Sequence, residues 1–209
     1  MEEKQNNLYA FDLEYRTEKL ILCGVDEAGR GPLAGDVYAA AVILDEKNII
    51  EGINDSKKIS EKKRDALYEE IIEKSVSYSI AKASVEEIDK YNILNAAMLA
   101  MKRAVEALDL TPTLVLIDGN KKPDLFVNSI SIIKGDTLSA SIAAASILAK
   151  VARDNYMKEV AKKYPQYLFE KHKGYATKLH YEMLDTYGQS DVHRNSFLRK
   201  YYNDKQGNG

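Results

Sequence analysis

Leu20–Asp26, with the sequence LILCGVD, is the stretch that decides the fold of this 209-residue chain. The apolar run is short and is followed by the glycine-rich segment Ala28–Gly35 (AGRGPLAG). A short apolar run that ends at such a segment is typical of a buried β-strand. Val37–Leu44 (VYAAAVIL) is a second run of this kind, and we predict that the two strands form a hairpin.

The rest of the chain alternates between strand and helix patterns. In chain order, the sequence predicts a helix over 60–74 with Ser60 as N-cap, a strand over 76–83, a short helix after Ser84, a helix over 92–108, strands over 113–117 and 129–133, and a long helix over 137–163 opened by Asp136. Short helical or irregular pieces follow Pro165. This order indicates an α/β fold, a central mixed β-sheet flanked by helices, with a C-terminal helical part.

The composition is that of an ordinary globular protein. Cys23 is the single cysteine, which excludes an intrachain disulfide and a zinc-type cysteine site. The start is too polar for a signal peptide and no apolar stretch can span a bilayer, which favours a cytoplasmic protein without membrane contact. We expect a monomer with one domain over 1–209, a core over about 18–163, helices over about 164–202, and disorder in the first several residues and in a flexible tail over 203–209.

Charge is unevenly distributed although the net charge is only −2. Residues 150–202 contain 11 Lys/Arg against 6 Asp/Glu, whereas residues 1–149 contain 18 against 25. An acidic first part and a basic last part suit a protein that binds metal ions and phosphates. Charge alone fits a normally solvated helical surface better.

Acidic residues follow the predicted strands or precede the long helix: Asp26 with Glu27, Asp118, and Asp136. Carboxylates at neighbouring strand ends converge, and they repel one another unless cations lie between them. Oxygen-only ligands select Mg²⁺ or Mn²⁺ over zinc. Two such ions can activate a water and stabilise the leaving oxygen of a phosphodiester. The residues themselves therefore indicate a two-metal phosphoryl-transfer site.

Each acid also has a simpler interpretation. Asp26 and Glu27 fit an exposed turn, Asp118 before Gly-Asn fits an Asx-turn, and Asp136 fits an N-cap. Taken singly, these interpretations are favoured, because turns and caps are common. Taken together they are weakened, since all of these acids mark the ends of apolar strands. Asp154 fits an ion-paired helix face better than a catalytic position.

Gly24–Gly35 (GVDEAGRGPLAG) resembles the sequence signature of the ribonuclease HII family. The similarity continues at 55–58 (DSKK), 91–95 (YNILN), 117–120 (IDGN), 135–136 (GD), 143–150 (AAASILAK), 153–154 (RD), 172–178 (HKGYATK) and 193–197 (HRNSF). It covers about residues 18–198. The sister family, ribonuclease HIII, generally lacks Gly-Arg-Gly in the first segment and has an additional N-terminal domain, so it matches less well.

The resemblance implies an RNase H-like fold and an endonuclease that acts on RNA/DNA hybrids and on single ribonucleotides in duplex DNA. It implies that Asp26, Glu27, Asp118 and Asp136 are catalytic and bind two Mn²⁺ or Mg²⁺ ions. The segment Gly29, Arg30 and Gly31 matches the part of the family that recognises the ribose 2′-OH at an RNA–DNA junction. Tyr175 matches the tyrosine that stacks on the sugar beside the scissile phosphate.

Other matching positions are candidates for phosphate contacts: Ser56, Lys57, Lys58, Lys150, Lys173, Lys178, His193 and Arg194. A solvated charge is an equally good interpretation of any one of them. Near the end, Asn195, Leu198, Tyr201 and Tyr202 faintly resemble a sliding-clamp-binding peptide. A terminal helix face packed on the domain explains these residues more simply.

Two rival functions stay open at this point. A different metal nuclease or phosphatase on a related fold would be indifferent to the 2′-OH. A non-catalytic hybrid-binding protein would have no use for four clustered acids. The chain also departs from prolines that are common in the family at Asp36, Gln189 and Asp191, which concerns loop shape rather than chemistry.

Overall fold

A five-stranded mixed sheet forms the centre of the molecule, in the strand order β3-β2-β1-β4-β5. The computed structural model describes residues 2–16, 20–54, 56 and 59–206. The strands are β1 (Leu22–Ala28), β2 (Val37–Leu44), β3 (Ser75–Ala83), β4 (Leu114–Asp118) and β5 (Asn128–Ile132). β2 pairs antiparallel with both β1 and β3, whereas β1–β4 and β4–β5 are parallel. The predicted hairpin and the mixed sheet are both confirmed.

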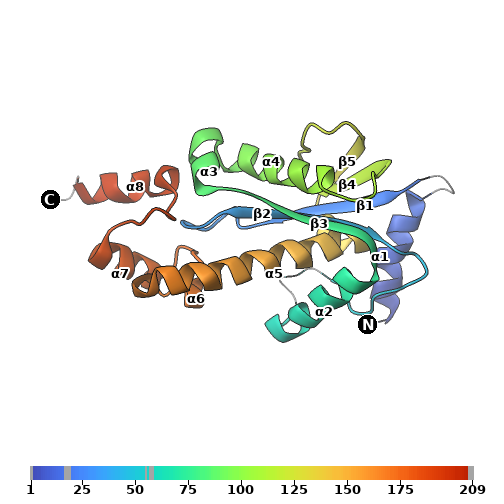
Figure 1. The fold of residues 1–209 in the computed structure, drawn as a ribbon, viewed down its shortest axis with the longest axis horizontal. Coiled ribbons are helices and arrows are strands. Elements are labelled where there is room, and N and C mark those ends of the chain that lie inside the picture. The colour runs from blue at the N-terminus through green and yellow to red at the C-terminus, as the bar shows by residue number, and fades with distance from the viewer. Residues whose placement is uncertain (1, 17–19, 55, 57–58, 207–209) are drawn as a thin grey trace.

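Helices cover both faces of this sheet. They are α1 (Glu2–Glu14), α2 (Glu61–Lys74), α3 (Val85–Tyr91), α4 (Ile93–Glu106), α5 (Ala140–Lys163), α6 (Phe169–His172), α7 (Lys178–Tyr187) and α8 (Asn195–Gln206). Helix α4 lies on one side of the sheet and α5 on the other, while α6, α7 and α8 gather at the end of the molecule away from α1 (Figure 1). No helix in the described part of the chain is both long and apolar enough to cross a membrane.

Strand β2 is apolar throughout because both of its faces are covered. Ala39 and Ala41 belong to the cluster under α4, whereas Ala40 and Val42 belong to the cluster under α5. Side chains alternate between the faces of a strand, so a strand between two helical layers loses the usual polar alternation.

The small side chains of α5 allow this helix to approach β1 closely. A Cβ atom added at Gly24 would lie 2.1 Å from the backbone carbonyl carbon of Ser141, so this position accepts glycine alone without movement of the helix. The alanine-rich first half of α5 thus packs directly against the sheet.

The ends of three predicted elements need correction. The chain is helical from Glu2 rather than disordered, and Asp12 of α1 accepts hydrogen bonds from the backbone N and Oγ of Ser141. Helix α5 begins at Ala140 with Ser139 as its N-cap, so Asp136 lies in a separate 3₁₀ turn (Gly135–Thr137) and does not cap the helix. Helix α8 runs to Gln206, into the stretch assigned to the tail, and residues 207–209 lie outside the described residues.

Replacing Gly24 with alanine should destabilise the protein by about 1–3 kcal/mol, because the added methyl group meets helix backbone that cannot move cheaply. Denaturant unfolding followed by circular dichroism measures this loss. Gly31→Ala is the matched control, since its Cβ would meet nothing closer than Tyr175 Cε1 at 3.9 Å. Equal stability of Gly24→Ala and the unmodified protein would contradict the proposed close packing.

Candidate active site

The four predicted acids lie at one end of the central strands. Asp26 and Glu27 lie near the C-terminal end of β1, and Asp118 is the last residue of β4. Val25 is level with Ile117 in the parallel register, which places Asp26 beside Asp118. Asp136 follows β5, and its backbone N donates to Asp118 Oδ1 at 3.4 Å. Strand register and the 3₁₀ turn thus bring together residues that are far apart in the sequence.

These acids affect one another electrostatically. The pKa of Asp26 is raised well above its usual value, first because the carboxyl group is buried and then because Glu27 and Asp118 are nearby negative charges. A hydrogen bond from Ser146 on α5 and one from the Glu27 backbone N, at 2.7 Å from Asp26 Oδ1, oppose this effect. The arrangement is one that a cation would stabilise.

Carboxylate oxygens are the ligands that Mg²⁺ and Mn²⁺ prefer, so the donor set fits such ions. Within the residues that the structure describes, no three His, Cys, Asp or Glu side chains are already set at metal-binding spacing. An ion would therefore have to draw the carboxylate groups of Asp26, Glu27, Asp118 and Asp136 closer together.

The glycine-rich segment borders the acids directly. Arg30 Nη1 lies 3.1 Å from Glu27 Oε1, and both Arg30 and Gly31 are exposed. Gly29 has a φ of +100°, and a Cβ there would meet Arg153 Nε at 2.1 Å, so glycine is required on both counts. The backbone N of Leu33 donates to Gly174 O at 2.8 Å. This bond joins the segment to the loop that contains Tyr175.

Tyr175 lies next to the same segment. Its Cε1 atom is the nearest atom to a Cβ added at Gly31, and 41% of the residue is exposed. The structure therefore places a partly exposed tyrosine ring beside Gly31.

The candidate phosphate contacts have different environments. Ser56 is buried and its Oγ lies 2.9 Å from Ser146 Oγ, behind Asp26. Lys57 and Lys58 lie outside the described residues. Lys150 pairs with Asp154 at 2.6 Å, which confirms the ion-paired interpretation of that acid.

Lys173 and Lys178 lie in the C-terminal helical part. Lys173 Nζ donates to Glu170 O at 2.7 Å, and the side chain of Lys178 is 93% exposed. Their ammonium groups stay near solvent, where a phosphate could approach.

Burial corrects the prediction that His193 and Arg194 bind phosphate. His193 is 1% exposed and Arg194 is 0% exposed. The Arg194 guanidinium donates to backbone carbonyls of the protein itself, so it has no open side for a substrate oxygen.

Sequence reasoning missed that the three histidines form one buried cluster. His180 Nδ1 donates to Tyr175 O at 3.0 Å, and His193 Nδ1 accepts from Ser190 N at 2.9 Å. The remaining pair, His193 Nε2 and His180 Nε2, lies 3.0 Å apart, so His193 donates and His180 accepts. His172 likewise donates through Nε2 and accepts through Nδ1. Every ring is thus held neutral in a defined tautomer.

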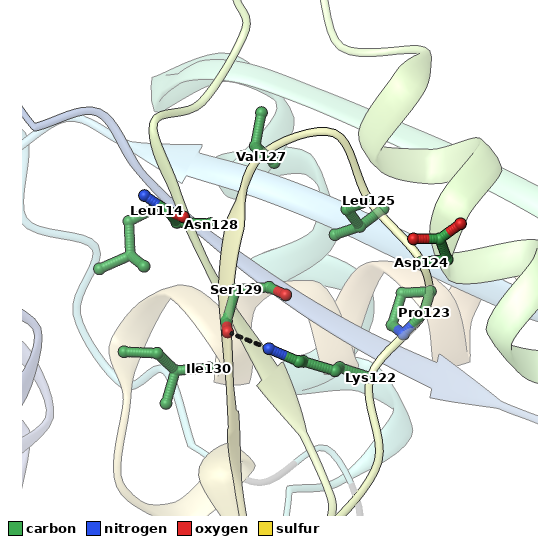
Figure 2. Close-up of a pocket in the computed structure, with 9 residues that line it drawn as sticks. All are labelled: Leu114, Lys122, Pro123, Asp124, Leu125, Val127, Asn128, Ser129 and Ile130. Carbon is green, nitrogen blue, oxygen red and sulfur yellow. Dashed lines mark hydrogen bonds between the residues drawn. The ribbon is translucent and has the colours of Figure 1, made fainter.

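A separate open pocket of about 650 Å³ lies along the edge strand β5, at the beginning of β4 and away from Asp118 (Figure 2). Lys122 Nζ donates to Ser129 O at 3.0 Å and so covers an edge carbonyl. A lysine placed in this way protects an edge strand from pairing with another chain. The pocket contains none of the candidate catalytic residues.

Comparison with known proteins decides which family this arrangement represents. The family model for ribonuclease HII matches residues 23–201. The chain belongs to the ribonuclease HII family. It is 59% identical over 178 residues to the ribonuclease HII of Caldicellulosiruptor bescii. The aligned region covers 85% of this chain and 86% of that protein.

Solved structures agree with this assignment. The ribonuclease H2 of Pyrococcus horikoshii superimposes with a TM-score of 0.70 and 26% identity, over 84% of this chain and 92% of that one. The ribonuclease HII of Archaeoglobus fulgidus, solved in complex with PCNA, gives a TM-score of 0.68 and 25% identity over 84% and 94%. The chain has an RNase H-like fold and is a metal-dependent endoribonuclease with ribonuclease H activity.

Acid should unfold this ribonuclease HII through its histidine cluster. Burial lowers the pKa of both His180 and His193 from 6.5 to about 4. Between these values the unfolded chain binds protons that the folded protein excludes, so stability is complete above pH 6.5 and falls towards pH 4. The slope should approach 1.4 kcal/mol per pH unit for each histidine, and urea unfolding at several pH values measures it.

His193→Asn is the control for this slope. The asparagine oxygen can accept from Ser190 in place of Nδ1 but does not titrate. We expect a less stable protein at pH 7.5 with a flatter pH dependence below 6.5. An unchanged slope would assign the acid sensitivity to other groups.

Proposed function

We propose that this ribonuclease HII cleaves the RNA strand of RNA/DNA hybrids and incises duplex DNA 5′ to a single embedded ribonucleotide, leaving 3′-OH and 5′-phosphate ends. The observation that supports this most is the joining of two features at one sheet end. Asp26, Glu27 and Asp118 lie at the strand ends, and the Gly29–Gly31 segment with Tyr175 borders them through the Glu27–Arg30 ion pair.

Asp26, Glu27, Asp118 and Asp136 would hold two Mn²⁺ or Mg²⁺ ions. Such ions, when bound, supply charge stabilisation and an activated water for phosphodiester hydrolysis. Hydrogen bonds within the protein already hold two of these acids. Ser146 on α5 bonds Asp26, and the Asp136 backbone N bonds Asp118.

The 2′-OH is the local feature that marks a ribonucleotide within DNA. Glycine allows backbone amides to approach a sugar closely, and Gly31 has open space apart from the Tyr175 ring. The exposed Tyr175 ring can stack on the sugar beside the scissile bond. Recognition of the ribose 2′-OH and hydrolysis of the phosphodiester are thereby assigned to adjacent residues.

The duplex outside the scissile site would be held by lysines. Lys173 and Lys178 suit this role because they stay near solvent, and Lys57, Lys58 and Lys150 are further candidates. We assign residues of about 18–163 to the catalytic core and about 164–202 to a substrate-contacting helical part of the same domain.

A sliding-clamp contact through the C-terminus is a weaker proposal, prompted by the archaeal relative solved with PCNA. In this chain Leu198 is 1% exposed and packs with Leu33 and Leu184. The terminal residues thus form a packed helix face, and a clamp would have to bind the outer side of α8.

The decisive experiment compares Asp136→Asn with the unmodified protein on a labelled duplex that contains one ribonucleotide. Incision should fall by at least about 100-fold, because loss of one carboxylate weakens the charge stabilisation by several kcal/mol. The melting temperature without metal should not fall, since one repulsive charge is removed. Asp124→Asn, on the exposed β4–β5 loop, is the matched control and should cut normally.

The remaining outcomes separate the rival functions. Equal cutting of an all-DNA duplex would indicate a nuclease that ignores the 2′-OH. Cutting of the hybrid without incision at a single ribonucleotide would keep the metal chemistry and remove the junction proposal. Binding without metal-dependent cutting of either substrate would indicate a hybrid-binding protein.

A further inference from the structure

The buried guanidinium of Arg194 is surrounded by the glycine-rich segment. Its Nη2 donates to Gly29 O and Gly35 O, each at 2.7 Å, and its Nη1 donates to Arg30 O at 3.1 Å and Pro32 O at 2.7 Å. Nε also donates to Gly35 O, at 2.9 Å. One side chain thus fixes the direction of most peptide groups in this turn.

The orientation of these carbonyls determines where the amides point. All peptide bonds in the described chain are trans, and a trans peptide directs its C=O and N–H to opposite sides. Since the carbonyls of Gly29 and Arg30 point at Arg194, the following amides, those of Arg30 and Gly31, point away from it. Both residues are exposed, and neither amide has a hydrogen-bond partner among the described residues.

A second buried arginine also holds the turn. Arg153, also 0% exposed, donates to Ala34 O at 3.2 Å, Asp36 O at 3.3 Å and Lys173 O at 3.1 Å. Its guanidinium carbon lies 5.7 Å from the centre of the Tyr175 ring. Arg153 therefore holds the glycine-rich turn and the tyrosine loop in one arrangement.

We propose that Arg194 and Arg153 are positioning residues for ribose recognition: they direct the amides of Arg30 and Gly31 and the ring of Tyr175 towards the 2′-OH and its sugar. This inference rests on the proposed function. Lysine cannot replace either residue, because a single ammonium lacks the planar fork that contacts several carbonyls at once.

The test measures preference for ribose rather than activity alone. Binding of a duplex with one ribonucleotide and of the identical all-DNA duplex is compared in an Asp136→Asn background with Mg²⁺, which keeps the substrate intact. Arg194→Lys should lower the ratio of the two affinities about tenfold, since two hydrogen bonds to the 2′-OH are misdirected. Affinity for all-DNA duplex should stay unchanged. Arg153→Lys should lower the same ratio.

Two controls separate positioning from general damage. Arg199→Lys makes the same substitution at an exposed site of α8 and should keep the full preference. Met101→Ala, at a buried site in α4 whose core cluster contains no residue of the glycine-rich turn, should lower the melting temperature yet keep the preference. If Arg194→Lys is too unstable to assay, Arg153→Lys decides the question at a temperature where it remains folded.

The outcomes are distinct. A folded Arg194→Lys or Arg153→Lys protein that keeps the full preference would overturn the positioning inference. Loss of preference in Met101→Ala as well would overturn it too, because instability alone would explain the result. Absence of any preference in the Asp136→Asn background would instead refute the proposed function.

Discussion

The close approach of α5 to β1 is the constraint on which the rest of the structure depends. It begins where Gly24 meets the backbone of Ser141 and continues along the same helix. Ser146 bonds Asp26, Arg153 packs on Gly29, and Met157 Sδ would lie 2.5 Å from a Cβ at Gly35. One helix therefore constrains both the position of Asp26 and the shape of the glycine-rich turn, so that neither can shift without the other.

The packing of α5 on the sheet explains how the protein tolerates the unfavourable burial of charged groups at this site. Asp26 is buried near other acids, and Arg153 and Arg194 are buried cations, each of which is unfavourable in isolation. The acids are stabilised by hydrogen bonds, and the arginines by backbone carbonyls. Because α5 is anchored by apolar packing on the sheet, these polar networks add specificity to a fold that does not depend on them for its core.

The sequence predicted the fold well wherever a few consecutive residues determine the local structure. β2 has the predicted bounds, and Ser84 forms the expected capping box with Glu87. The errors lie where distant residues decide. Helix α1 is stabilised by Asp12 bonding Ser141, and Asp36, which stands where proline is common, accepts from Val85 N at 3.1 Å and Lys82 Nζ at 2.7 Å. Neither partner is visible in the local pattern.

The candidate site shows the same difference between local sequence signals and contacts of distant residues. The sequence predicted that acids lie at the strand ends and that a glycine-rich segment follows the first strand, whereas it did not predict which basic residues are buried. A basic C-terminal segment suggests a phosphate-binding surface, but Arg153, His193 and Arg194 are buried in the structure. Under the proposed function, electrostatic attraction of the duplex is therefore assigned to exposed lysines such as Lys178, which are strongly hydrated point charges with little geometric preference. Arginine here shapes the protein's own glycine-rich turn, and under the proposed function that turn, rather than the positive charge, would distinguish ribose from deoxyribose.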